Sequence, residues 1–229
     1  MESLNSFIYN IRNSPKAGQG NSDDNKLNPR QIEFWIRYYR ASILKEMMLK
    51  NLSIDAIFQQ DLGVVPLTEV DMTDQNCSEL LKWGCNIKKV KIPVPVMGSG
   101  NSPALWVGFI NKQNPIIVSK ANHVFFREKT HFGKNVNRSF LIGNTLYVMF
   151  KNEFKKTKYI NVRLIAEQPK DAYNYSTEGC TPTCFNPMTD AYPLSLDVYQ
   201  KIVDKIFPRE LTIVQSSKTD EINDGREDT

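Results

Sequence analysis

The chain has 229 residues, 41% of them hydrophobic and 24% charged, a composition typical of a globular protein rather than a disordered one. Its formal net charge of +4 permits contact with nucleic acid but does not by itself indicate it. No stretch approaches the roughly 18 consecutive apolar residues of a membrane span, and the first residues lack the basic start and apolar core of a secretory signal. We therefore expect a protein that makes no membrane contact and works in a cytoplasm or in an assembly formed there.

The first 27 residues predict a short helix followed by a polar linker. Apolar residues spaced by three and four are typical of one face of a helix, and here they are Leu4, Phe7, Ile8 and Ile11. Residues 13–26 have no apolar periodicity and contain two glycines, which favours a linker or a flexible binding loop.

Residues 28–50 predict the longest helix. Asn28 is a favoured N-cap, Pro29 suits the first helical position, and Gln31 stands where a capping box places a glutamine. Apolar residues then follow at helical spacing, namely Ile32, Trp35, Ile36, Tyr39, Ile43 and Met47. Phe34 and Tyr38 add a second apolar line, so we expect this helix to be covered on two sides, by its own domain or by a partner.

A short helical piece capped by Ser53 is expected next, and Gly63 then ends the helical pattern. The region up to residue 167 predicts strands, because short runs rich in Val, Ile, Phe and Tyr alternate with turn residues. The runs are VKIPVPV, ALWVGFI, PIIVSK, HVFFREK, SFLIGNTLYVMF and KYINVRLIAEQ. Gly143 and Asn144 form a two-residue hairpin signal within the fifth run. Six short strands with tight turns indicate a small antiparallel barrel or sandwich.

Residues 168–190 contain three prolines and predict a long loop, a feature that in compact domains is usually functional or held by a partner. A second helix is expected from Ser195, its cap, with a kink or new turn at Pro208. Its apolar stripe consists of Leu196, Tyr199, Ile202, Val203 and Ile206. The last fourteen residues carry a net charge of −3 and leave +7 on the rest, which favours an interaction arm or a disordered solubilising end.

We therefore predict an α+β protein in which a helical core holds an inserted antiparallel β barrel or sandwich and both termini are extended. The two predicted helices are expected to pair, with the β domain inserted between them in sequence. The expected segments are an N-terminal arm and linker (1–27), the first segment of the helical core (28–62), the inserted β domain (63–167), a long loop (168–191), the second segment of the helical core (192–211) and an extended acidic tail (212–229).

The sequence offers little for catalysis. Phosphate-loop, dinucleotide-binding, zinc-protease and nucleophile-elbow motifs are absent. The two histidines, His123 and His131, are interpreted as strand-end residues, and no pair of carboxylates suits acid–base chemistry. We therefore predict a protein that is not an enzyme and uses no cofactor.

Two binding alternatives stay open at this point. The cysteines, Cys77, Cys85, Cys180 and Cys184, lack the tight spacing usual in structural zinc sites; we expect ordinary thiols and keep zinc as a minor alternative. Lys155, Lys156 and Lys158 lie among aromatics in KNEFKKTKY, which suits phosphate contact, so a nucleic-acid-binding β domain is the second alternative. A hairpin end with solvated lysines is the simpler interpretation.

Several segments, in this order and spacing, resemble a structural protein of crAss-like bacteriophages, which infect gut Bacteroidales. The segments are FIYNIRN, NSDDNKLNPRQIEFWIRYYRASI, QDLGVVPLTEVD, KWGCNIKKVKIP, SFLIGNTLYV, KYINVR and YPLSLDVYQKIVDKI. The family is the ring protein attached below the portal at the head-to-tail junction, and the resemblance covers nearly the whole chain. The portal-proximal ring is favoured, with another ring or tail-tube protein of the same tail as the alternative.

The resemblance implies a virion structural protein assembled in the host cytoplasm, with a helical tail-adaptor core carrying the β insertion. Tail adaptors of short-tailed phages (podoviruses) form rings of twelve subunits under the dodecameric portal, close the DNA exit channel and provide a platform for tail assembly. The implied partners are further copies of the chain, the portal, neighbouring ring or tail proteins and, transiently, the genomic DNA in the channel.

This implied function assigns roles to particular residues. The second face of the long helix is expected to contact the neighbouring subunit through Phe34, Arg37, Tyr38 and Arg40. The C-terminal tail is expected to dock onto the portal through Leu211, Ile213, Val214 and Ile222. Lys155, Lys156 and Lys158 are the candidates for facing DNA.

Overall fold

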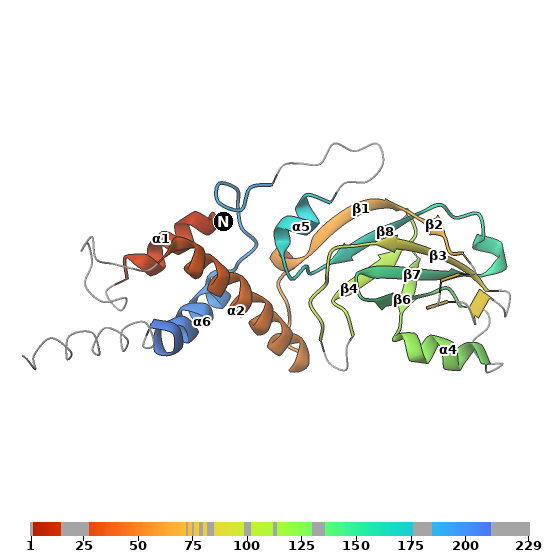
Figure 1. The fold of residues 1–229 in the computed structure, drawn as a ribbon, viewed down its shortest axis with the longest axis horizontal. Coiled ribbons are helices and arrows are strands. Elements are labelled where there is room, and N and C mark those ends of the chain that lie inside the picture. The colour runs from red at the N-terminus through yellow and green to blue at the C-terminus, as the bar shows by residue number, and fades with distance from the viewer. Residues whose placement is uncertain are drawn as a thin grey trace, which may run out of the picture. The chain divides into compact units, whose positions relative to one another are not determined.

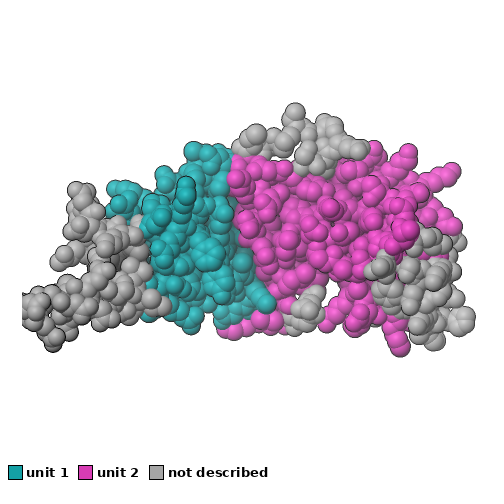
Figure 2. Space-filling model, viewed as in Figure 1, with its two compact units in different colours: residues 1–47, 186–229 teal, residues 48–185 magenta. Residues whose placement is uncertain are grey.

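The computed structural model describes residues 2–14, 28–71, 73–74, 76–77, 80–81, 85–98, 102–111, 114–129, 136–175 and 185–211. The chain divides into two compact units (Figure 2). Unit 1 combines Met1–Met47 with Asn186–Thr229, and unit 2 is Met48–Phe185. Among the helices of the described ranges, none is both long and apolar enough to cross a membrane.

Unit 1 contains the helices α1 (Leu4–Arg12), α2 (Pro29–Leu49) and α6 (Leu196–Ile206), which runs on into a π-helical turn, Phe207–Leu211 (Figure 1). These match the three helices predicted from periodicity. Side-chain oxygens cap all three: Ser3 accepts from the Ser6 amide at 3.3 Å, Asn28 from Arg30 at 3.0 Å, and Ser195 from Val198 at 3.4 Å.

Contacts between residues far apart in sequence hold unit 1 together. The Phe7 ring on α1 packs against the Tyr199 ring on α6, with centroids 4.6 Å apart. The Tyr39 hydroxyl of α2 donates to Glu210 at 2.7 Å, and Lys205 of α6 lies 3.4 Å from Glu46. These contacts place α2 beside α6 and its continuation, the pairing that the sequence predicted. The buried apolar side chains of unit 1 include most of the predicted stripes, namely Leu4, Phe7, Ile8, Ile11, Ile32, Trp35, Ile36, Tyr39, Ile43, Ile202 and Ile206. The stripe of α6 differs from the prediction at its start: Leu196, the first helical residue, is 71% exposed, and Val198 is buried instead.

Unit 2 is built around one eight-stranded sheet with the order β1-β8-β4-β5-β6-β7-β3-β2. The strands are β1 (Gln60–Pro66), β2 (Thr68–Glu69), β3 (Asn86–Lys91), β4 (Leu105–Gly108), β5 (Pro115–Val118), β6 (Arg138–Ile142), β7 (Thr145–Phe150) and β8 (Tyr159–Leu164). The two edge strands, β1 and β2, are joined by Leu67 alone, so the chain passes directly from one edge of the sheet to the other. The sheet is therefore curled into a nearly closed barrel (Figure 1).

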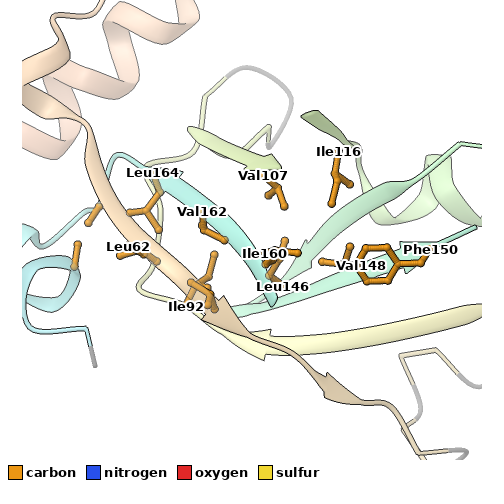
Figure 3. Packing of buried hydrophobic residues seen from close by; sticks show 13 residues of the cluster. Leu62, Ile92, Val107, Ile116, Leu146, Val148, Phe150, Ile160, Val162 and Leu164 are labelled. Atoms are coloured by element: carbon orange, nitrogen blue, oxygen red, sulfur yellow. The ribbon is translucent and has the colours of Figure 1, made fainter. Parts of the chain in front are cut away.

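Side chains that alternate inward along these strands fill the barrel. The buried cluster includes Val65, Val107, Ile116, Leu146, Val148, Ile160, Val162 and Leu164 (Figure 3). In β8 the inward residues are 160, 162 and 164, so 159, 161 and 163 face outward. The predicted hairpin at Gly143 and Asn144 is confirmed, with Gly143 at φ 60° between the paired Ile142 and Thr145.

The structure corrects the prediction of a purely antiparallel sheet. β5 and β6 are parallel, whereas the other pairs of the described sheet are antiparallel. A parallel pair needs a crossover connection, and the segment HVFFREK supplies it as the helix α4 (Ala121–Lys129) instead of the predicted strand. His123 accordingly lies on a helix and is not a strand-end residue.

Three smaller predictions also change. The short helical piece is a 3₁₀ turn, Ala56–Phe58, capped by Asp55 rather than Ser53, with the Ile57 amide donating to Asp55 at 3.2 Å. Gly63 lies within β1, at a bulge with φ 72°, so the strand begins before it. The predicted long loop contains a helix, α5 (Pro169–Tyr173), whose buried Ala172 joins the barrel cluster.

Candidate interaction surfaces

The outer face of β3, β7 and β6 is covered by the chain's own segments. Phe140, Tyr147 and Met149 point outward from β6 and β7 and form a second buried cluster with Val70, Cys77, Leu80 and Val124. Val124 belongs to α4, and the others come from the segment between β2 and β3. Within the described ranges, this half of the barrel's outside therefore offers no large apolar surface to a partner.

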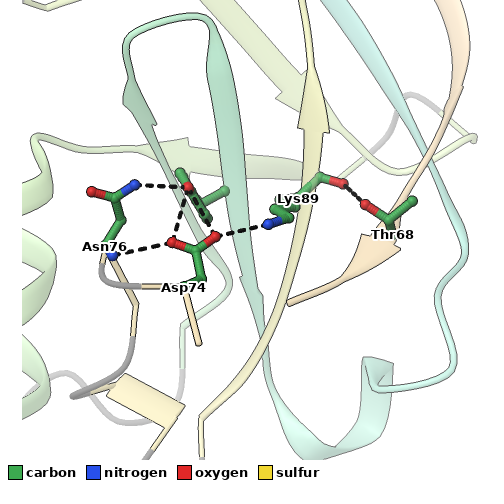
Figure 4. A network of polar contacts seen from close by, with 5 residues as sticks. Thr68, Asp74, Asn76 and Lys89 are labelled. Carbon is green, nitrogen blue, oxygen red and sulfur yellow. Dashed lines mark hydrogen bonds and ion pairs between the residues drawn. The ribbon is translucent and has the colours of Figure 1, made fainter. Parts of the chain in front are cut away.

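A polar network fastens the segment between β2 and β3 to the strands (Figure 4). Asp74 accepts from the ammonium of Lys89 at 2.8 Å and from the Tyr147 hydroxyl at 3.3 Å, and the side-chain amide of Asn76 donates to that hydroxyl at 3.2 Å. The hydrogen bond from Lys89 is the main cause that holds the pKa of Asp74 below its usual value, against the opposing effect of burial. The same bond raises the pKa of Lys89. The network is a structural clamp, because all of its groups satisfy one another.

The outer face of β1, β8, β4 and β5 is open in the described part of the chain. The register places Val64, Tyr159 and Ile117 on this face, and each is at least two-fifths exposed. The face also carries the partly exposed ion pair of Asp61 and Arg163, so it mixes apolar and charged side chains and is a candidate interaction surface.

A fixed aromatic residue stands in the middle of this open face. Trp106 and Gly108 point outward from β4, and the Trp106 indole lies over Gly108 so closely that a side chain at 108 would overlap it. The Arg163 guanidinium lies 5.3 Å from the centroid of the Trp106 ring, and its Nε donates to Asp61 at 3.2 Å. Asn161, opposite Gly108, is only 2% exposed, and its side-chain oxygen has no hydrogen-bond partner among the described residues.

Sequence reasoning missed this arrangement, although some of it is visible in the sequence. Residues two apart on a strand share a face, so Trp106 and Gly108 in LWVG could have been read as a large side chain beside a vacant position. The contribution of Arg163 and Asp61 depends on strand pairing, which nothing local in the sequence indicates.

The predicted second face of α2 divides into two regions. Phe34 and Tyr38 are 64% and 59% exposed, and their rings stack with centroids 6.2 Å apart and planes 14° apart. Arg37 is partly exposed and forms an ion pair with Glu33 one turn earlier. The two aromatic side chains, here named the α2 aromatic pair, therefore project from unit 1.

Arg40 does not belong to that exposed face, and this corrects the sequence-based assignment. Its side chain is 0% exposed, its Nε donates to the carbonyl of Pro193 at 3.1 Å, and its guanidinium lies 5.9 Å from the Tyr192 ring centroid. Helical spacing alone put Arg40 beside Arg37, but Arg40 lies next to the buried Tyr39 and turns inward. It braces the segment that leads into α6.

The remaining predicted sites are the three lysines before β8 and the C-terminal tail. Lys155, Lys156 and Lys158 are exposed in the turn between the 3₁₀ turn Asn152–Phe154 and β8, here named the lysine turn. The backbone of Leu211 ends the described chain, and the other tail residues, Ile213, Val214 and Ile222, lie outside it.

Two of the four cysteines lie within the described residues. Cys77 and Cys85 form no disulfide bond in the structure, and burial is the main cause that raises the pKa of Cys77 to about 12. Cys180, Cys184 and His131 fall outside the described residues. Within the described residues, no group of three or more His, Cys, Asp or Glu side chains could hold a metal ion.

The open sheet face and the α2 aromatic pair are two different apolar surfaces on one chain, which is typical of a subunit of a larger assembly. The chain matches the family described as phage tail ring protein 2 over residues 6–229. It therefore belongs to this family and is a ring protein of crAss-like phages, as the resemblance indicated. No curated protein matches the chain.

Proposed function

We propose that the protein forms a closed ring of twelve copies below the portal, at the head-to-tail junction of the virion. Membership of the ring family supports a structural, assembling component of the phage tail. The position, the copy number, the closing of the DNA exit channel and the platform for tail assembly are our proposal, carried by the resemblance of the sequence to tail adaptors. In this proposal unit 1 acts as the helical adaptor core.

One structural observation carries the ring itself. A ring needs a heterologous contact, in which one face of each subunit meets a different face of the next. The chain presents two such faces, the α2 aromatic pair on unit 1 and the open sheet face on unit 2. A single self-complementary patch would instead favour a two-fold dimer.

The position in the tail stack has two candidates. The sequence resemblance favours the portal-proximal ring, and another ring of the same tail is the alternative. Electron microscopy of intact particles, with the chain traced in the map, separates them. Rings of this chain against the portal support the first position, rings separated from the portal by another ring support the second, and absence from the tail rings would refute the proposal.

The C-terminal tail is proposed to dock onto the portal or the adjacent ring. Truncation after Leu211 tests this better than truncation after Phe207, because it keeps Glu210, which accepts the hydrogen bond from Tyr39. The truncated subunit should still fold, but it should assemble poorly. Particles with normal tails in normal yield would refute docking by residues 212–229.

The lysine turn supports a secondary proposal, contact with DNA in the channel. The three lysine side chains are exposed, and no acidic residue lies among them in the sequence, although Glu153 lies just before them. Binding of the full chain to duplex DNA should then weaken steeply with salt, and reversal of Lys155, Lys156 and Lys158 to glutamate should abolish it. Binding that is absent at low salt, or unchanged by the reversal, would refute DNA contact there.

A further inference from the structure

A cavity of about 240 Å³ lies at the start of β4 and the end of β8. Its lining includes Ile54, Ala104 and Leu105 together with Trp106 and Arg163 of the open sheet face. All of its lining residues belong to unit 2. A cavity of about 150 Å³ is known to hold benzene, so this one has room for an aromatic side chain.

The cavity's aromatic wall is already fixed in place. Trp106 is held against Gly108, where no side chain intervenes, and Arg163 covers the indole while bound to Asp61. Side chains that are ordered before binding lose little conformational entropy when a partner arrives. An indole beside a guanidinium offers an incoming aromatic ring both apolar contact and a cation–π interaction. Trp and Arg are also the residues that most often dominate binding energy at interfaces.

The same chain carries a protruding group that suits this cavity. Phe34 and Tyr38 stack on one another and project from α2, each more than half exposed. The flanking Arg37 is neutralised by Glu33 on the same helix, so the pair does not bring an uncompensated cation toward Arg163. Burial of the Phe34 ring in the cavity would remove apolar surface of both groups from water, so the occupied cavity is favoured over an exposed ring and a solvated cavity.

We infer that, in the ring, the cavity beside Trp106 receives Phe34 of the neighbouring copy, with Tyr38 packed against the rim formed by Arg163. This inference rests on the proposed function, because it names the residues of the subunit contact. The occupant is a second copy and not another tail protein, since both complementary halves occur on one chain of a ring-forming family. Because the halves are different surfaces, the contact leaves one half of each copy available for the next, as a ring requires.

Cross-linking between two single-site variants of the full chain tests the contact. Chains with Phe34→Cys are mixed at high concentration with chains with Ile54→Cys and oxidised, and the linked peptides are identified by mass spectrometry. The 34–54 linkage should form many-fold more than linkage of position 34 to Ile110→Cys, an exposed site that does not line the cavity. Tyr9→Cys, an exposed aromatic site on α1, should not link to position 54. Equal yields at all positions, or no 34–54 linkage, would overturn the inference.

Complementation tests whether the two halves lie on different copies. Phe34→Asp disables the protruding half and leaves the cavity intact, whereas Ile54→Asp disables the cavity and leaves the aromatic pair intact. Each variant alone should fail to self-associate, while their mixture should form one-to-one dimers in sedimentation velocity. A mixture that associates no better than either variant, or variants that assemble like the unaltered chain, would overturn the inference.

Electron microscopy of particles separates this inference from the proposed function. If the chain forms tail rings but the 34–54 linkage does not form, the ring contact lies elsewhere and the proposed function stands. Cross-linking of position 54 to a different tail protein would likewise overturn the assignment of the occupant. If the chain is missing from the tail rings, both proposals fail.

Discussion

Replacement of Gly108 by alanine is expected to destabilise unit 2, although alanine usually stabilises an element relative to glycine by about 0.5–1 kcal/mol. A Cβ built at Gly108 would lie 2.8 Å from Cζ2 of Trp106 and closer still to Cη2, and the three nearest atoms all belong to that indole. The ring must therefore turn away. Its displacement forfeits about 0.5–1 kcal/mol of cation–π interaction with Arg163. It also forfeits some of an aromatic side chain's burial, about 1–2 kcal/mol.

These opposing contributions leave a net loss of about 1 kcal/mol in the free energy of unfolding. Native-state hydrogen exchange at the amides of β8, which pairs with β4, reports the stability of unit 2 without interference from unit 1. The decisive control is the same substitution in a Trp106→Ala background. There the obstruction is gone, so Gly108→Ala should be neutral or stabilising by about 0.5 kcal/mol.

The loss of stability is thus predicted to disappear or to become a gain in the Trp106→Ala background, with a coupling of about 1–2 kcal/mol between positions 106 and 108. An equal loss in both backgrounds would show that the indole is not what requires glycine here, and would refute the fixed aromatic wall of the cavity. A stabilising Gly108→Ala in the unaltered chain would do the same.

Arg40→Met should lower the free energy of unfolding by about 1–3 kcal/mol in urea denaturation, because the buried Pro193 carbonyl loses its donor. Asp74, whose pKa is lowered chiefly by Lys89, contributes stability that is present above its unfolded pKa of about 3.9 and lost as the pH falls through its lower folded value. In Asp74→Asn, measured stability should therefore fall less steeply below about pH 4 than in the unaltered chain. Cys77, with a pKa raised to about 12 by burial, should react with iodoacetamide at pH 8 only as fast as unit 2 opens.

Each of these outcomes has a matched comparison. Arg37→Met removes an arginine with a solvated ion pair and should cost less than about 0.5 kcal/mol, so an equal cost for Arg40→Met would refute the buried brace. Parallel loss of stability with acid in the Asp74→Asn and unaltered chains would refute the contribution of the network. Labelling of Cys77 as fast as the partly exposed Cys85 would refute its burial in solution.

The sequence correctly predicted those elements whose conformation depends on interactions between residues only a few positions apart. Helices α1, α2 and α6 follow from apolar spacing and from caps at Ser3, Asn28 and Ser195, which act on amides two or three positions away. The hairpin follows from the pair Gly143 and Asn144 between apolar runs, because glycine readily adopts the positive φ found at position 143. The same local reasoning failed for α4, because HVFFREK has the composition of a strand and only the parallel pairing of β5 with β6 requires a crossover there.

The candidate interaction surfaces also divide into features that local sequence predicts and features that depend on long-range contacts. The sequence by itself determined that Phe34 and Tyr38 lie on a helix face beyond the buried stripe, since their position follows from helical geometry. It also determined the family, because many ordinary residues in order carry that match. Only the tertiary structure decided that Arg40 turns inward to Pro193, and that Trp106, Arg163 and Asp61 meet on three neighbouring strands. Those contacts join residues up to 153 positions apart, and which long-range partners meet depends on strand register and chain reversal, which no local pattern encodes.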